Sequence, residues 1–265
     1  MALNKILVII DPTNDAQPAF ERGLDSARDT GAVLHLYTCA NQDAGFSDEQ
    51  EAKDKVQPIL DALRERVTGE NYEATTELEW GADWASQAVA AAQRYGASMI
   101  FKNSFDHSAL DREKRQTSDW TLLRMSKCPV LMVKNFHDWE HRRVLAAINP
   151  ASSESAHVKL DEKISALAQQ LATTYGSDAH FVTAFQDLNH APNAEQIAQR
   201  YSAKAEHVHL RKGKAAEVIR DVASELDVDL IIVGTVARDG IKGRVVGNTC
   251  ERLLDQTHSD LLVLN

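Results

Sequence analysis

The sequence predicts an α/β protein made of two tandem doubly wound domains, each a mainly parallel five-stranded sheet with helices on both faces. Short apolar runs rich in β-branched residues alternate along the chain with stretches whose apolar residues recur at helical spacing. This alternation is typical of parallel sheets with right-handed crossovers. It starts again near the middle of the chain, and both halves end in a similar apolar run, PVLMVKN and SDLLVLN. A pattern that repeats at half the chain length indicates two copies of one domain.

The first half contains five expected strands, each a short run that is continuously apolar or alternates apolar and polar side chains. They cover residues 5–10, 32–38, 74–80, 98–104 and 129–135. Four helices are expected between them, because apolar side chains there recur every three or four residues and so share one face. These helices are centred on residues 20–27, 48–67, 84–95 and 118–125.

The second half repeats this order. Its expected strands cover residues 143–150, 180–185, 206–213, 226–233 and 259–265. Its expected helices carry apolar stripes within residues 160–171, 193–201, 218–226 and 248–256. Asn149 follows the first strand of this half in the place that Asp11 holds in the first half. The polar segment 135–142 separates the two patterns, and we expect domains at residues 1–138 and 142–265.

Composition narrows the class of protein. With 265 residues, 43% of them hydrophobic, the chain can bury two domain-sized cores. Its formal net charge of −10 argues against nucleic acid or an anionic membrane surface as the main partner. Its three cysteines are far apart and indicate neither a disulfide framework nor a zinc cluster. Neither a signal peptide nor a membrane-spanning apolar run is recognised, so we expect a soluble cytoplasmic protein.

The strongest candidate for a functional site is the segment between the expected strand 226–233 and the helix that opens at Asn248, its expected N-cap. Its glycines let the backbone approach a ligand closely, and the unpaired N–H groups at a helix start attract anions. Thr249 adds a hydroxyl donor. The glycines are Gly234, Gly240, Gly243 and Gly247, and the cations among them are Arg238, Lys242 and Arg244. The segment suits a phosphate, although a glycine-rich turn that only joins strand to helix has a similar sequence.

The equivalent loop of the first half, residues 103–120, contains no glycine. Arg112, Lys114 and Arg115 supply charge there, but side chains would keep the backbone N–H groups away from a phosphate. We therefore predict that the first half has no nucleotide site. In the second half, Asn149 can hydrogen-bond a ribose or a base, yet it brings no negative charge for a metal ion. An Asx turn after the strand is the simpler interpretation of Asn149.

The spacing of the second-half loop resembles the signature of the universal stress protein family. In that signature a strand is followed by Gly, two residues, Gly, nine residues, Gly and then Ser or Thr. Gly234 and Gly247 match the first and last glycines, Ala237 stands at the middle one, and Asn248 replaces the Ser or Thr, with Thr249 one place later. The resemblance covers the whole chain as two tandem family domains. It implies an adenine nucleotide alpha hydrolase-like fold, with a degenerate first domain and a partly retained nucleotide loop in the second.

In this family the loop cradles the phosphates of ATP, so the resemblance implies a site for ATP or AMP in the second domain, with Mg²⁺ only if ATP is bound. It also implies a cytoplasmic stress-response role, which in two-domain members is tied to survival of DNA damage and oxidants. Single family domains dimerise through their last strands, so the resemblance implies an internal pseudo-dimer through residues 129–135 and 259–265. We also expect other proteins as partners, and a further homodimer stays open. The implied site residues are Asn149, Gly234, Ala237, Arg238, Gly240, Gly247, Asn248 and Thr249.

Two hypotheses of different class remain. The first is a nucleotide-binding regulatory protein, which the retained glycines and Thr249 favour. The second is a scaffold, or a carrier of an apolar small molecule, in which the loop is a relic; Ala237 and Asn248 favour it. Catalysis is the weaker expectation, because we find no G-x-S-x-G motif, no Cys and His pairing and no distinctive carboxylate pair. We expect no enzyme, or at most a very slow ATPase.

Three histidines of the second half are candidate metal ligands. His207 and His209 alternate on the expected strand 206–213 and so face the same side. They could seat a transition metal with a third ligand, for which His180 is the only nearby candidate. Histidines on strands are more often packed or exposed than metal-bound, and we expect no metal here.

Overall fold

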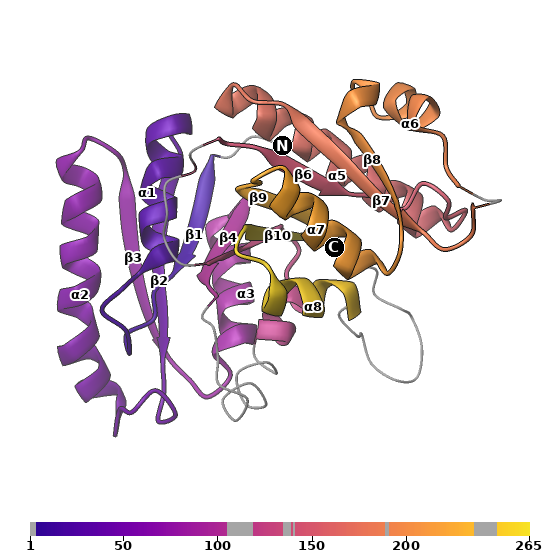
Figure 1. The fold of residues 1–265 in the computed structure, drawn as a ribbon. Helices are drawn as coiled ribbons and strands as arrows, with labels where there is room; N and C mark the ends of the chain where they lie inside the picture. The colour runs from indigo at the N-terminus through magenta and orange to yellow at the C-terminus, as the bar shows by residue number, and fades with distance from the viewer. Residues whose placement is uncertain (1–3, 105–118, 135–138, 140, 189–190, 236–247) are drawn as a thin grey trace. The chain divides into compact units, whose positions relative to one another are not determined.

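The computed structural model describes residues 4–104, 119–134, 139, 141–188, 191–235 and 248–265 (Figure 1). From residue 2 onward it divides into two compact units, residues 2–136 and residues 137–265. Among the described residues, no helix is both long enough and apolar enough to cross a membrane.

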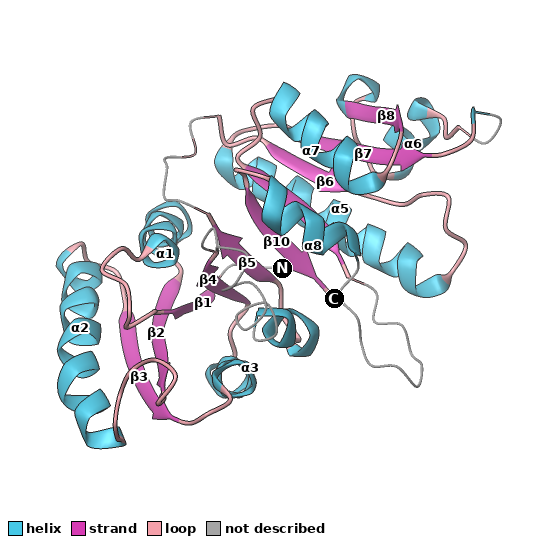
Figure 2. Cartoon of the chain, turned by 60° about the horizontal axis from the view of Figure 1, so that its bottom comes forward, coloured by secondary structure: helices cyan, strands magenta, loops and turns pink. Residues whose placement is uncertain are grey.

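The sheet of the first unit is entirely parallel, with the strand order β3-β2-β1-β4-β5. Figures 1 and 2 show helices on both of its faces, α1 and α2 on one and α3 on the other. Residues 119–125 are also helical. The strands are β1 (Lys5–Ile9), β2 (Val33–Ala40), β3 (Ala74–Trp80), β4 (Met99–Asn103) and β5 (Val130–Val133), and the helices are α1 (Pro18–Thr30), α2 (Glu49–Gly69) and α3 (Trp84–Tyr95).

The second unit repeats this topology, with the parallel order β8-β7-β6-β9-β10. The predicted fold class is therefore confirmed. The strands of the second unit are β6 (Val144–Ala147), β7 (Ala179–Phe185), β8 (Val208–Lys212), β9 (Leu230–Gly234) and β10 (Asp260–Leu264). Its helices are α5 (Ser155–Tyr175), α6 (Ala194–Arg200), α7 (Ala215–Glu225) and α8 (Asn248–Gln256), and a 3₁₀ turn, η2 (Ala205–His207), precedes β8.

Strand register shows which residues of the two units correspond. Asn103 ends β4 and Gly234 ends β9, and both pair with the last residue of the following strand. Asp11 and Asn149 each lie two residues beyond the end of the first strand of their unit, β1 and β6. These four residues therefore mark the same two places in the two units, as the sequence repeat predicts for Asp11 and Asn149.

Several predicted boundaries differ from the structure. The run expected as a strand from Leu226 begins only at Leu230, because α7 extends to Glu225 and Asp227 adopts a left-handed φ of 52°. The strand expected from residue 206 begins at Val208, after the η2 turn. Asn248, expected as an N-cap, is the first residue of α8. Apolar periodicity finds these elements and places their ends less well.

Short polar signals set several helix ends. The side chains of Asp48, Asp83 and Asn193 each accept the N–H of the residue three positions later, as N-caps do. Gly31 and Gly176 adopt the left-handed conformation directly after α1 and α5. The equivalent helix of each unit therefore ends with the same device.

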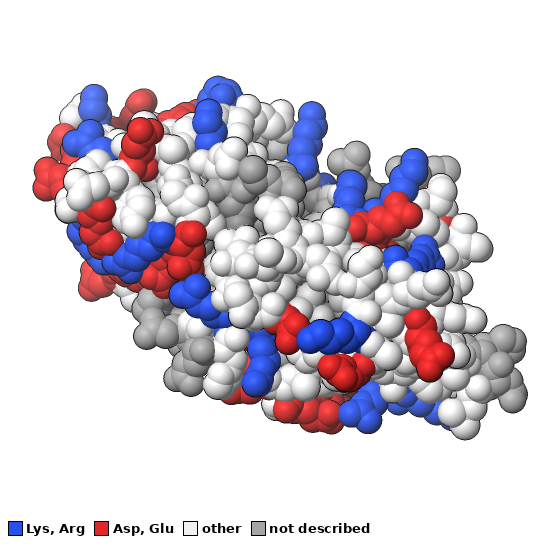
Figure 3. Space-filling model, turned by 90° about the horizontal axis from the view of Figure 1, so that it is seen from above, with Lys and Arg blue, Asp and Glu red and all other residues white. Residues whose placement is uncertain are grey.

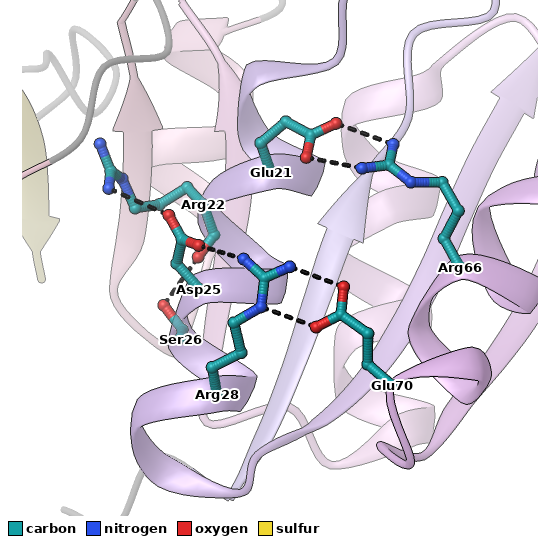
Figure 4. A network of polar contacts seen from close by, with 7 residues as sticks. All are labelled: Glu21, Arg22, Asp25, Ser26, Arg28, Arg66 and Glu70. Atoms are coloured by element: carbon teal, nitrogen blue, oxygen red, sulfur yellow. Dashed lines mark hydrogen bonds and ion pairs between the residues drawn. The ribbon is translucent and has the colours of Figure 1, made fainter.

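Two double ion pairs tie α1 to the end of α2 (Figure 4). The guanidinium of Arg66 donates to both oxygens of Glu21, at 2.8 and 2.9 Å. Arg28 donates to both oxygens of Glu70, at 2.7 and 2.6 Å, and a further N–H of Arg28 reaches Asp25 at 2.7 Å. Forked pairs of this kind fix orientation better than single contacts, so they restrain α1 and the end of α2 relative to each other.

Candidate functional site

The candidate site lies beyond the carboxyl ends of the strands, where strand order reverses, because ligands of doubly wound sheets bind at that point. In the second unit the reversal falls between β6, which Asn149 follows, and β9, which Gly234 ends. The crossover to the parallel strand β10 starts from this edge, so α8 opens there with the half-buried Thr249 in its first turn. The loop between Gly234 and α8 includes residues outside the described part of the chain. These are the predicted Ala237, Arg238, Gly240 and Gly247, together with Lys242, Gly243 and Arg244.

Packing explains why residue 234 is a glycine. A Cβ atom added to Gly234 would overlap the side chain of Leu160 on α5 and would lie 3.1 Å from Cδ1 of Ile164. Both of these side chains are buried. The sequence predicts a glycine that lets a phosphate approach; the structure gives this position a second requirement, which is close contact between α5 and the end of β9.

The first unit fills the equivalent place with an amide. Asn103 is buried, and its Oδ1 accepts the N–H of Ala19 at the start of α1, at 2.6 Å. Its Nδ2 donates to Oε1 of Gln17 at 3.3 Å. The difference follows from helix length, because α1 has 13 residues and α5 has 21, so Leu160 belongs to N-terminal turns that α1 lacks. The two units therefore close the same edge with different side chains.

Asn149 is exposed, and its backbone N–H donates to both carboxylate oxygens of Asp161, at 3.1 and 3.0 Å. Asp161 is buried and also accepts the Tyr201 hydroxyl at 3.4 Å. Burial raises the pKa of Asp161 above its ordinary value, although hydrogen bonds from Asn149 and Tyr201 oppose the rise. Sequence reasoning missed Asp161; the available signal was an acidic residue directly beside Leu160 in the apolar stripe of α5.

The first unit has paired charges at the corresponding edge. The Asp11 carboxylate accepts the N–H and hydroxyl of Thr13, at 2.9 and 2.6 Å, and the amide of Asn14 at 2.9 Å. Burial alone would raise the pKa of Asp11, but these hydrogen bonds and the charge of Lys102 outweigh it and lower the pKa. Lys102 in turn lies 3.0 Å from Asp119. Asp11 therefore forms an Asx turn. The loop that carries Arg112, Lys114 and Arg115 lies outside the described residues.

The three histidines considered from the sequence do lie together. His180 on β7 contacts both His207, which ends η2, and His209 on β8. Over the described ranges, however, no group of three or more His, Cys, Asp or Glu residues is arranged to hold a metal ion.

The fold and this edge define a tandem α/β protein with two doubly wound domains, each with a reversal of strand order. The model of the universal stress protein family matches residues 2–134 and again residues 136–265. The chain therefore belongs to the universal stress protein family, as the loop spacing predicts.

Relatives of similar length support this placement. The universal stress protein E homolog of Haemophilus influenzae is 25% identical, and the match covers 99% of this chain and 97% of that protein. Universal stress protein E of Escherichia coli K12 is 27% identical, with 98% and 93% covered. Among solved structures, a functionally unknown protein from Pseudomonas aeruginosa PAO1 is 28% identical with a TM-score of 0.81, covering 99% of this chain and 92% of that one.

Proposed function

We propose that the chain is a cytoplasmic stress-response protein that acts without catalysis, and that its second domain binds the phosphates of an adenine nucleotide. One observation carries the binding proposal: the glycine-rich loop leaves β9 at Gly234 and enters α8 at Asn248, on the edge where strand order reverses. Membership of the universal stress protein family supports the stress-response role. An ATPase activity, if one exists, would be slow.

The proposed contacts divide by chemistry. Backbone N–H groups at Gly240, Gly243 and Gly247 and the start of α8 would hold the phosphates, with the Thr249 hydroxyl as a further donor. Arg238, Lys242 and Arg244 would balance their charge. The exposed Asn149 would contact the ribose or the base. Either ATP, with Mg²⁺, or AMP would satisfy this set.

The asymmetry of the two domains is part of the proposal. In the first domain the Asn103 amide already caps α1, Lys102 is paired with Asp119, and the loop lacks glycine. These contacts leave fewer donors for a phosphate than the second domain offers. The proposed domains, residues 1–138 and 142–265, are therefore a degenerate copy and a copy with a partly retained loop.

A second candidate function is a scaffold, or a carrier of an apolar small molecule, with the loop a relic. A specific observation favours it: α5 occupies part of the edge, because Leu160 covers Gly234 and Asp161 takes the N–H of Asn149. A nucleotide would have to bind beside these groups rather than displace them.

Calorimetric titration of the full chain with ATP and with AMP tests the first function against the second. Arg238→Gln should weaken binding about tenfold, a typical loss for one charge-assisted phosphate contact. Arg112→Gln, the same change in the glycine-free loop, is the matched control and should leave binding unchanged. Gly247→Val should abolish binding while the fold persists by circular dichroism. No heat with either nucleotide, or equal losses in both arginine variants, would reject the nucleotide site.

The charge of the surface indicates which kinds of partner suit the protein. On the face drawn in Figure 3, basic and acidic side chains are interspersed. This mixture supports a protein or small-molecule partner over nucleic acid or an anionic membrane, which favour continuous basic surfaces.

We further propose that the runs at 129–135 and 259–265 make the chain an internal pseudo-dimer. Each domain expressed alone should then dimerise by light scattering, whereas the full chain should stay monomeric or form one further dimer.

A further inference from the structure

Three imidazole rings from neighbouring segments of the second unit pack against one another. The rings of His180 and His207 have centroids 4.4 Å apart and an interplanar angle of 34°. Those of His180 and His209 are 5.4 Å apart at 28°, and Nδ1 of His180 lies 3.2 Å from Nε2 of His209. The cluster joins β7 to β8 and to the η2 turn just before β8.

The cluster lies on an edge of this unit's sheet. β8 ends the strand order of the unit, and β7 is its one neighbouring strand among the described residues. Its register places His209 opposite Val182, which is buried. Successive side chains of a strand alternate faces, so His180 and Val182 share one face of β7. His209 therefore stands on this same face, where its ring contacts that of His180 across the two strands.

The groups around His180 and His207 have both signs. Asp178 lies 4.0 Å from Nδ1 of His207 and 3.4 Å from the ammonium of Lys204. Glu206 lies 3.9 Å from Nε2 of His207. For His180, the negative Asp178 favours the protonated ring and the positive Arg143 disfavours it.

His209 faces a different pair. Arg211, two residues on along β8, disfavours the protonated ring, and Glu225 at the end of α7 favours it. Arg211 and Glu225 are themselves paired at 2.9 Å. At His209 the effect of Arg211 exceeds that of Glu225, so the charges beside this ring add to the effect of its burial and disfavour the protonated form.

Adjacent imidazoles have two principal uses, which are binding a metal ion and taking up protons. Binding needs ring nitrogens that converge on one point, and no such group of three occurs among the residues that the structure describes. Proton uptake does not need ring nitrogens that converge on one point. One proton can be shared across the 3.2 Å contact between His180 and His209, whereas a second would place two positive rings side by side.

We propose that His180, His207 and His209 form an acid-responsive latch, in which neutral rings hold η2 and β8 against β7 and protonated rings release this edge of the second unit. The latch would let acidification loosen one sheet edge while the rest of the domain stays folded.

The direction of the response follows from the proton balance. Burial lowers the pKa of His180 to about 4, and His207 and His209 act in the same direction. Burial, with Arg211 and His207, also lowers the pKa of His209. An opened edge would return these rings to their ordinary pKa of 6.5, so the open state binds more protons below that value. The latch is closed above pH 6.5 and weakens as the pH falls toward 4.

Hydrogen exchange of the full chain, read by mass spectrometry at pH 7.5 and pH 5.0 and corrected for intrinsic rates, tests the latch. Peptides spanning residues 205–212 should show an opening equilibrium about thirtyfold higher at pH 5.0, the size expected when His180 regains its ordinary pKa of 6.5 from about 4. Peptides of β3, the edge strand of the first unit, are the internal control and should not change. An equal change at both edges, or none at residues 205–212, would reject the proposal.

Variants separate the latch from general acid sensitivity. His180→Asn should remove most of the acid-induced opening, whereas His258→Asn, at an exposed histidine of the same unit, should preserve it. If His180→Asn fails to fold, histidine-selective NMR of the unmodified chain replaces it, and His180 should titrate well below its ordinary pKa of 6.5. Titration of His180 at or above 6.5 would contradict the proposal. One equivalent of Zn²⁺ at pH 7.5 should leave the three rings unshifted, since stoichiometric shifts would make the cluster a metal site instead.

Discussion

Leu160 of α5 packs directly on Gly234, the last residue of β9, so closely that no side chain fits between them. Gly234→Ala should therefore destabilise the protein by about 1–3 kcal/mol, the usual cost of overpacking a buried contact. Urea unfolding measures the change. Gly69→Ala is the matched control, since a Cβ there meets nothing within 4 Å, and it should be neutral or slightly stabilising. Restoring stability to Gly234→Ala by adding Leu160→Ala would identify Leu160 as the cause.

This contact also decides how binding data should be interpreted. A loss of nucleotide binding in Gly234→Ala would not establish a phosphate contact, because the same substitution moves α5. Gly247, in the loop itself, is the better position for that question. If Gly234→Ala were as stable as the parent protein, the packing explanation for this glycine would be wrong.

The buried carboxyl group of Asp161 should make the stability of the protein depend on pH. Its pKa is raised in the folded state, mainly by burial, so the folded protein holds this proton more tightly than the unfolded chain does. Stability from this group is therefore highest below its ordinary pKa of 3.8 and falls as the pH rises through the raised value. Asp161→Asn keeps an oxygen that can accept the N–H of Asn149 and removes the charge. It should be at least as stable at pH 7 and should lack this decline.

The control for that variant is Asp161→Ala, which has no acceptor for the N–H of Asn149. It should lose about 0.5–1.5 kcal/mol, the usual net contribution of a hydrogen bond, because the Asn149 N–H is only partly buried. Thermal unfolding between pH 3 and pH 8 compares the three proteins. Equal stabilities for the Asn and Ala variants would show that the hydrogen bonds to Asn149 contribute nothing.

The ion pairs between α1 and α2 predict a charge-reversal result. Arg66→Glu or Glu21→Arg alone should cost up to about 1 kcal/mol, because the pair is half exposed and like charges would meet. Combining the two should recover part of this loss, with a coupling measurable by a double-mutant cycle in low salt. Recovery should be incomplete, since the guanidinium of Arg66 also lies 4.8 Å from the centroid of the Phe20 ring. Strictly additive losses would show that the pair is energetically silent.

The sequence predicts most of the fold, because periodicity reports which side chains a sheet buries. The continuous apolar runs that became β1 and β5 and the stripe from Leu160 to Leu171 in α5 each fall in the expected element. The end of α7 is less predictable, because the left-handed conformation of Asp227 interrupts the run 226–233, whose residues are typical of a strand. The site is harder still. Leu160 and Asp161 act on Gly234 and Asn149 across the fold, and no local spacing encodes such contacts between α5 and the ends of β9 and β6.

We expect the stability of the first unit to depend on Asn103, which holds the position that Gly234 has in the second unit. Asn103→Ala removes the acceptor for the Ala19 N–H and the donor to Gln17. It should cost about 1–2 kcal/mol, as the loss of a buried helix cap does. Ser104→Ala, one residue on, is the control and should change stability by less than about 0.5 kcal/mol. Because the adjoining loop still lacks glycine, Asn103→Ala should gain no affinity for ATP by calorimetry. A variant that is both stable and newly able to bind would mean that Asn103, rather than the loop, keeps nucleotide out of the first domain.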